Sequence, residues 1–207
     1  PNAPLVQGNG TSLYDCRKQQ VVYSLPLSRK YKEESIKLCL ENDWVWPVTG
    51  TAHTVMQIQM GDFRDDRNRS ITGDSISIAE YLNGEYTKIV YVVADPAQIP
   101  RLQALTDAFE TAGQMQQTLS SPVFLECYDK RAGKGVGVRL AMEMAGMQDK
   151  TLVCIGDFYN DVPMLKVADI AACPANAPED IKNLCQIVTC GNNDGALADL
   201  IEALEKM

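Results

Sequence analysis

Two carboxylates and an amide stand within five positions of this chain, at Asp157, Asn160 and Asp161. They directly follow residues 152–155, a continuous apolar run that predicts a buried strand. The carboxyl ends of such strands carry the chemistry of α/β enzymes, and hard oxygen ligands so closely spaced suit Mg²⁺ better than zinc or copper. A purely structural interpretation is also open, in which Asp157 ends the strand, Asn160 caps the next helix and Asp161 interacts with the dipole of its first turn.

A lysine and a second amide occupy similar junctions elsewhere. Residues 131–137 read R-A-G-K-G-V-G and open a predicted helix, which puts Lys134 near a helix N-terminus. A cation there opposes the helix dipole unless an anion such as a phosphate lies beside it, although a lone lysine is more often a solvated surface residue. Asn176 stands in a polar turn between a short apolar strand at residues 170–173 and a helix that starts near Pro178. The predicted strand ends therefore direct several polar groups to one edge.

Four motifs in a fixed order relate the chain to a known family. They are Lys134, the run G-D-F-Y-N-D at residues 156–161, the run A-N-A at residues 175–177, and D-G at residues 194–195. Over residues 122–207 they resemble the carboxy-terminal half of a haloacid-dehalogenase-superfamily phosphatase. The closest branch is the Cof-like one, which acts on sugar phosphates and related small phosphomonoesters. Residues 4–11, which end in Asn-Gly-Thr, resemble the short strand and turn that precede the cap domain in that branch.

The resemblance implies a role for each candidate site residue. Lys134, Asp157 and Asp161 are expected to be catalytic, with Asp157 and Asp161 at a Mg²⁺ ion. Phosphate and substrate contacts are expected from Lys134, Asn160, Asn176 and Asn9. Asp161 would act near the metal ion without touching it, or would orient Lys134. In this family an aspartate attacks a small phosphorylated metabolite and forms an aspartyl-phosphate that water then hydrolyses.

The resemblance fails at the nucleophile. No D-x-D-x-[TS] motif follows an apolar strand in the 207 residues, and the acidic cluster at residues 62–67 is expected to be a solvated loop. The Thr-Gly pair at residues 49–50 follows the Asn-Gly turn, so we assign it to the cap. We therefore expect a chain that lacks its first segment and is inactive alone. Such a chain would expose an apolar sheet edge, which the missing segment or a homodimer partner would cover.

Two alternatives to an inactive phosphatase fragment stay open. The chain could be a non-catalytic remnant that binds phosphate or metal and serves as an interaction or regulatory module, which the absent nucleophile favours. A separate polypeptide could also supply the nucleophile strand. Against the remnant stands the retained set of one lysine, two aspartates and one asparagine, which a purely structural scaffold would not require.

Charge and composition narrow the function further. The net charge of −8 comes from 27 acidic and 19 basic residues, and the basic residues are dispersed, which opposes nucleic-acid binding. No stretch approaches the roughly 18 apolar residues of a membrane span, so no membrane role is expected. The seven cysteines form no C-x-x-C pair and the only histidine is His53, which opposes a zinc site. The odd number and scatter of the cysteines indicate a reducing, cytoplasmic compartment.

Patterning divides the chain into modules of two kinds. We predict that residues 1–11 end a first core segment, that residues 12–120 form an α+β cap that selects the substrate, and that residues 121–207 form the C-terminal part of the core. Within the cap we predict a hairpin over residues 12–25 and helices over residues 29–42, 75–82 and 96–112. The predicted fold class is α/β, with a partial Rossmann-like core built on a parallel sheet and an added α+β cap.

Overall fold

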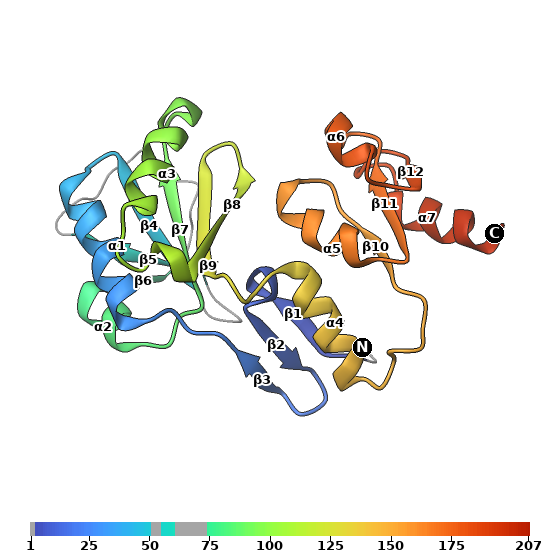
Figure 1. Ribbon diagram of the computed structural model, residues 1–207, viewed down its shortest axis with the longest axis horizontal. Helices are drawn as coiled ribbons and strands as arrows, with labels where there is room; N and C mark the ends of the chain where they lie inside the picture. The colour runs from blue at the N-terminus through green and yellow to red at the C-terminus, as the bar shows by residue number, and fades with distance from the viewer. Residues whose placement is uncertain (1–2, 51–54, 61–73) are drawn as a thin grey trace.

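The computed structural model describes residues 3–50, 55–60 and 74–207, so His53 and the acidic cluster at residues 62–67, predicted to be a solvated loop, lie outside the described residues (Figure 1). The strands are β1 (Leu5–Gln7), β2 (Ser12–Asp15), β3 (Gln20–Ser24), β4 (Val45–Gly50), β5 (Val55–Gln59), β6 (Asp74–Ser77), β7 (Lys88–Val93), β8 (Met115–Ser121), β9 (Phe124–Asp129), β10 (Val153–Ile155), β11 (Ile170–Pro174) and β12 (Ile187–Thr189). The α-helices are α1 (Arg29–Glu41), α2 (Ile78–Asn83), α3 (Ile99–Asp107), α4 (Lys134–Met144), α5 (Val162–Val167), α6 (Glu179–Lys182) and α7 (Ala196–Glu205). Short 3-10 helices include η1 (Gly8–Gly10), η3 (Pro96–Gln98), η4 (Ala112–Gln114) and η5 (Tyr159–Asp161). None of the helices in the described part of the chain is long and apolar enough to cross a membrane.

The largest sheet has six strands in the order β6-β5-β4-β7-β9-β8, and they are antiparallel except for the β5–β6 pair. Helices α1, α2 and α3 pack on one side of it and share one hydrophobic core with it (Figure 1). The centre of this core is fully buried and includes Tyr81, Ile89, Tyr91, Leu102 and Leu125. Strand alternation assigns the remaining side chains to the opposite face of the sheet, which these helices do not cover.

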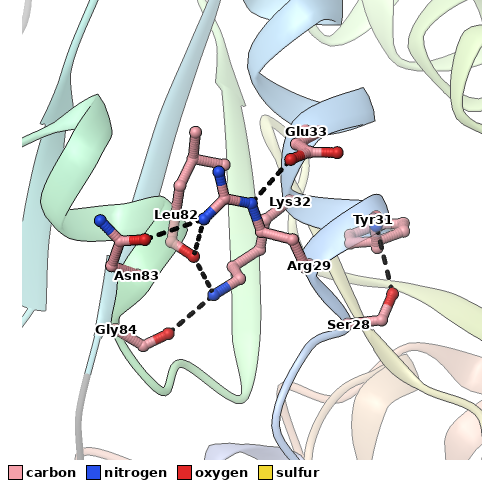
Figure 2. Close-up of polar contacts among 8 residues, drawn as sticks. All are labelled: Ser28, Arg29, Tyr31, Lys32, Glu33, Leu82, Asn83 and Gly84. Atoms are coloured by element: carbon pink, nitrogen blue, oxygen red, sulfur yellow. Dashed lines mark hydrogen bonds and ion pairs between the residues drawn. The ribbon is translucent and has the colours of Figure 1, made fainter.

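Two cations on α1 hold the end of α2 (Figure 2). Lys32 is buried, and its Nζ donates to the carbonyl oxygens of Leu82 at 2.8 Å and Gly84 at 2.7 Å. The Arg29 guanidinium donates to the same Leu82 carbonyl at 3.2 Å and to the side chain of Asn83 at 2.9 Å. The last carbonyls of a helix lack partners within it, so these cations satisfy them and complement the helix dipole. Burial, followed by the nearby charge of Arg29, lowers the pKa of Lys32.

Strands β1, β2 and β3 form a separate antiparallel sheet, which confirms the predicted hairpin.

Helix α4 approaches η1 and α5 through glycines. Gly10 has a φ of +85°, and a Cβ there would collide with the backbone of Gly133. A Cβ on Gly135 would likewise collide with the carbonyl of Pro163 in α5. Because α4 is held from both sides at its first turn, the position of its first residue, Lys134, is fixed.

The third sheet consists of β10, β11 and β12 in that order, all parallel, as the alternation of strands and helices after residue 130 predicts. Its core includes Cys154 from β10, Cys173 from β11, Leu165 from α5 and Ile181 from α6. Within the described residues β10 pairs only with β11, so its other edge carries no strand there. The carboxyl end of β10 leads directly into the loop that holds the predicted site.

Two of the predicted helices are shorter than the sequence pattern suggests. Residues 75–77 belong to β6, and α2 begins only after Ser77, which forms a capping box with Glu80. The helix predicted over residues 96–112 divides into η3, which the Asp95 side chain caps, and α3, which ends at residue 107. In the first segment a local cap sets where the helix starts, and apolar periodicity does not register that boundary. In the second segment the start agrees with the prediction, and the difference lies at the C-terminal end.

The predicted boundaries between modules fall inside paired structure. Residues 120–122 cover the end of β8 and the start of its turn into β9, and these two strands are hydrogen-bonded neighbours in the six-stranded sheet. Strands β2 and β3, predicted as part of the cap, pair with β1 instead. We propose boundaries near Ser24 and Asp129, where the chain leaves one sheet for the next.

Candidate functional site

Lys134 and Asp161 form an ion pair at the start of α4, although they are 27 residues apart in the sequence. The Nζ of Lys134 donates to Oδ1 of Asp161. The Asp161 side chain is 8% exposed and that of Lys134 is 28% exposed, so the carboxylate is enclosed while the ammonium still reaches solvent. An ammonium has three donors, and those that Asp161 does not use can bind a second anion.

The second oxygen of Asp161 organises the loop after β10. Oδ2 accepts the backbone N–H groups of Asp157 at 3.1 Å and Phe158 at 3.3 Å. Gly156 provides the necessary room, because a Cβ at this position would collide with the Asp161 side chain. Both carboxylate oxygens of Asp161 are therefore engaged by donors of the protein, and this one side chain holds the lysine and the loop together.

The carboxylate of Asp157 and the amide of Asn160 have no side-chain partner in the described part of the chain. Asp157 is exposed, and Asn160 is half-buried in η5. A free carboxylate, an amide oxygen and water match the needs of Mg²⁺, which keeps several waters and takes one or two carboxylates. No group of three or more His, Cys, Asp or Glu within residues 3–50, 55–60 and 74–207 could hold a metal ion by itself. The residues present thus fit a hydrated magnesium ion better than a zinc ion held entirely by protein ligands.

The other two predicted asparagines form hydrogen bonds within the protein. Oδ1 of Asn176 accepts the backbone N–H of Asn192 at 2.9 Å, which ties the turn after β11 to the loop before α7. Asn9 has a left-handed backbone with a φ of 61°, and its Nδ2 donates to Glu126 in β9 at 2.5 Å. The same carboxylate pairs with Lys88 at 2.8 Å. Asn9 thus connects η1 to the six-stranded sheet in this structure.

A cavity of about 400 Å³ opens beside Asp157 and Asp161. Its wall continues through the ends of β10 and β11 and the start of α7, with Ile155, Gly156, Pro174, Asn192, Gly195, Ala196, Leu197 and Ala198. The D-G motif at residues 194–195 is the sequence signal for this wall, because it marks the turn into α7. Asn192 and the first turn of α7 were not among the predicted site residues.

Sequence reasoning also missed the Lys88–Glu126 pair. The Glu126 side chain is only 8% exposed and stands between Leu125 and Cys127, which are both fully buried. A charge inside an apolar strand is a signal, since a buried carboxylate needs a partner. The sequence does not identify that partner, because the pairing depends on the register of β7 and β9.

Tyr159 begins η5, the short helix in the loop after β10. Its side chain is 45% exposed, and its ring packs edge-on against Phe158 with the centroids 5.0 Å apart. The hydroxyl lies beside the Asp180 carboxylate, whose negative charge raises the pKa of Tyr159. Cα atoms of η5 lie within 8 Å of Cα atoms of β8. The loop that carries Asp157 therefore faces the edge of the other sheet.

Comparisons with known proteins agree with this architecture. A family model described as haloacid dehalogenase-like hydrolase matches residues 2–201. A solved sugar phosphatase of HAD subclass IIB superimposes with a TM-score of 0.78 at 16% identity, covering 99% of this chain and 76% of that chain. A solved protein from Streptococcus mutans gives a TM-score of 0.82 at 16% identity, covering 99% and 77%. At these identities the likeness shows the fold alone, and it confirms the predicted α/β class.

Two curated proteins match a shorter segment of this chain. A phosphoglycolate phosphatase from Methanopyrus kandleri is 36% identical over 75 residues, which is 36% of this chain and 32% of that protein. A phosphoglycolate phosphatase from Methanosarcina acetivorans is 35% identical over 75 residues, which is 36% of this chain and 33% of that protein. The matched segment therefore spans about a third of the length of these relatives.

Proposed function

Because this chain belongs to the haloacid dehalogenase-like hydrolase family, we propose that it provides the metal- and phosphate-binding part of a Mg²⁺-dependent phosphatase for small phosphomonoesters. The observation that carries the proposal is the Lys134–Asp161 pair beside the carboxylate of Asp157, which has no side-chain partner in the described part of the chain. Phosphoryl transfer needs a cation on the phosphate and a carboxylate for the metal ion, both held in place before the substrate arrives.

Each side chain takes one role in this proposal. Asp157 would hold Mg²⁺ together with water, and the ion, when bound, neutralises charge on the transferring phosphoryl group. Lys134 would bind a non-bridging phosphate oxygen with the donors that Asp161 leaves free. Asn160 would donate its amide N–H to the phosphate or the leaving group. Asp161 would act as a positioning residue, since both of its oxygens are already engaged by donors of the protein.

The nucleophile is the remaining requirement of the reaction. No D-x-D-x-[TS] motif follows an apolar strand in the 207 residues. In this proposal the attacking aspartate therefore comes from a segment outside these residues, in the same protein or in a separate polypeptide. The same reasoning makes the chain by itself a binding unit without turnover.

The activities for which the relatives are named favour two substrate classes. One solved relative is a sugar phosphatase, and two curated relatives act on phosphoglycolate. Both classes are small phosphomonoesters that share the phosphate group and differ in the leaving group. The proposed contacts of Lys134 and Asp157 concern only the phosphate and are therefore common to both.

Calorimetric titration with inorganic phosphate tests the proposal. We expect binding that is strengthened by Mg²⁺, and we expect Asp157→Asn to remove the Mg²⁺-dependent part, about tenfold or more. Asp161→Asn should weaken phosphate binding with and without Mg²⁺, because the ammonium of Lys134 loses the carboxylate that holds it in position. Asp149→Asn is the matched control, since Asp149 is 73% exposed and lies outside the site.

Two outcomes would contradict the proposal in different ways. Absence of phosphate binding, or binding that none of the site variants changes, would remove the site itself. Hydrolysis of p-nitrophenyl phosphate by the 207-residue chain, lost in Asp157→Asn, would support the phosphatase and overturn the expectation that the nucleophile lies elsewhere. Phosphate binding that persists without turnover, even when the remaining family segment is added, would favour the non-catalytic module.

A further inference from the structure

The turn between β1 and β2 has a left-handed backbone over three successive residues. Residues 8–10 have φ values of 55°, 61° and 85°. Glycine adopts this conformation readily, whereas Asn9, in the middle of the turn, adopts it at a cost that the surrounding structure must offset. Nδ2 of Asn9 donates to Oε2 of Glu126 in β9 at 2.5 Å. Oγ1 of Thr11, which is fully buried, donates to Oγ1 of Thr87 at 2.8 Å, so a second bond ties the turn to the residue before β7.

The same turn lies against the first turn of α4. Cα atoms of η1 and α4 lie within 8 Å of each other, and Figure 1 shows the blue turn after β1 beside the start of α4. A Cβ on Gly10 would collide with the backbone of Gly133, and a Cβ on Gly137 would collide with the Cα of Gly10. The two elements therefore meet backbone to backbone. Since Lys134 is the first residue of α4, the position of the turn determines the position of this lysine.

Glu126 holds the turn from the side of the six-stranded sheet. Its neighbours Leu125 and Cys127 pack into the core with the helices, so Glu126 lies on the opposite face of β9. Its side chain is 8% exposed, and Oε2 accepts both the amide of Asn9 and the ammonium of Lys88, the latter at 2.8 Å. The lysine compensates the buried charge, so a full carboxylate is available to Asn9. A hydrogen bond to a charged acceptor is stronger than one to a neutral acceptor.

A second side chain of the six-stranded sheet reaches the start of α4. Nε2 of Gln116 in β8 donates to the backbone carbonyl of Ala132, two residues before Lys134, at 2.5 Å. In the β8–β9 register Gln116 lies on the same face of the sheet as Glu126. This face therefore holds the start of α4 at two points, once directly and once through η1.

We propose that Glu126 is a positioning residue for the phosphate site, which acts on Lys134 through Asn9 and the backbone of η1. The inference rests on the proposed function, since Lys134 is the phosphate-binding cation in that proposal. It gives Asn9 a different role from the one that the sequence predicts, because the amide is a partner of Glu126 and not a ligand of phosphate. Loss of this bond would let the left-handed turn relax, and the start of α4 with it. The six-stranded sheet thus contributes to phosphate affinity without touching the phosphate.

A double-mutant cycle, followed by calorimetric titration with inorganic phosphate, tests this role. Asn9→Gly removes the amide and keeps the left-handed backbone, and Glu126→Ala removes the acceptor. Each should weaken phosphate binding about three- to tenfold, and the double variant should be no weaker than either single variant, because both remove the same bond. Glu126→Gln keeps an acceptor for Asn9 and should stay within about twofold of the native affinity. Glu41→Ala is the matched control and should change nothing, since this glutamate also pairs with a lysine in the region of the six-stranded sheet but is 61% exposed.

Amide hydrogen exchange of Gly137 gives a second readout, which needs no phosphate. Its N–H donates to the carbonyl of Gly133 at 2.9 Å, which is the first backbone hydrogen bond of α4. We expect faster exchange in Asn9→Gly and in Glu126→Ala, and native exchange in Glu126→Gln. Should Glu126→Ala fail to fold because Lys88 stays unpaired, Asn9→Gly and Glu126→Gln carry the comparison.

The outcomes separate failure of this inference from failure of the proposed function. Additive losses in the double variant would overturn the inference, because Asn9 would then contact phosphate independently of Glu126. Equal losses in Glu126→Ala and Glu126→Gln would also overturn it, since the charge of Glu126 would then set the affinity. Faster exchange with unchanged phosphate affinity would remove the positioning role and leave the proposed function standing. No phosphate binding by the native chain would remove the proposed function, whereas native exchange of Gly137 in Asn9→Gly would remove the inference alone.

Discussion

Among the described residues, the core of the six-stranded sheet with α1, α2 and α3 contains sixteen buried side chains, mostly Leu, Ile, Val and Tyr, whereas the core of the parallel sheet that leads to Asp157 contains seven, of which four are Ala or Cys. Hydrophobic stabilisation scales with the apolar area that is buried, at about 25 cal/mol per Å². The larger core therefore gives the first region more hydrophobic stabilisation than the second. The candidate site lies in the region with the smaller core.

Exposed apolar side chains point to the same difference. Leu197 and Ile201 on α7 are 63% and 51% exposed, and Val188 on β12 is 51% exposed. All three belong to the region of the parallel sheet, where β10 also has an unpaired edge within the described residues. Unpaired edges and exposed apolar faces favour association with another chain segment. Coverage by a further segment or by a second copy of the chain stays a prediction.

The largest expected effect comes from truncating one core leucine in each region. Leu125→Ala, in the six-stranded sheet, should cost about 3–5 kcal/mol, and Leu165→Ala, in α5, about 2–3 kcal/mol, because a smaller core relaxes more easily. Trp44 and Trp46, the two tryptophans of the chain, belong to the first region. Denaturant unfolding followed by tryptophan fluorescence should therefore respond mainly to Leu125→Ala, while far-UV circular dichroism should respond to both variants.

The contrast between the two regions is wrong if tryptophan fluorescence and far-UV circular dichroism always report the same shift of the unfolding transition. A shift of the tryptophan transition by Leu165→Ala as large as the shift by Leu125→Ala would mean that the regions unfold as one unit. Separate unfolding transitions for the two probes would support the contrast, because the region of the candidate site would then unfold locally while the six-stranded sheet stays folded.

Much of the fold was accessible from the sequence because the signals were local. The apolar run before Asp157 and the helix that begins at Lys134 follow from patterning, and both are confirmed. The module boundary was less accessible, because pairing of β8 with β9 depends on contacts across the sheet and not on the composition of residues 120–122. Patterning shows where strands are and does not show which of them pair.

The candidate site was likewise predictable only in part from the sequence. The pairing of Lys134 with Asp161 follows from the family motif and is present in the structure. The bond from Asn9 to Glu126 could not be predicted, since it depends on how η1 sits against β9. The sequence also could not show that both oxygens of Asp161 accept hydrogen bonds from the protein. It left two roles open for Asp161, one near the metal ion and one in orienting Lys134, and these hydrogen bonds favour the second role.

A smaller effect is expected from the cation that joins α1 to α2. Lys32→Met removes a donor to the carbonyl of Gly84 and one of the two donors to the carbonyl of Leu82, which Arg29 also contacts, and this loss should cost about 1–3 kcal/mol. Lys37→Met is the matched control on the same helix, because Lys37 is 75% exposed and should change stability by less than about 0.5 kcal/mol. Equal effects of the two substitutions in thermal unfolding would show that the contacts of Lys32 in Figure 2 do not stabilise the region of the six-stranded sheet.

The smallest effect concerns Asp129, where the chain leaves the larger region. Its carboxylate accepts the backbone N–H of Arg131 at 2.8 Å and the guanidinium at 2.7 Å, and these bonds, led by the guanidinium, lower the pKa of Asp129. Since the folded-state pKa lies below the ordinary value of 3.8, the contribution is present at neutral pH and is lost as the pH falls through the folded-state pKa. Arg131 is 70% exposed, so Asp129→Asn should cost at most about 1 kcal/mol at pH 7, and the difference from the native chain should close on acidification. A difference that widens in acid would mean that the protonated carboxyl holds the junction, and the connection between the regions would then be stronger than this exposed pair allows.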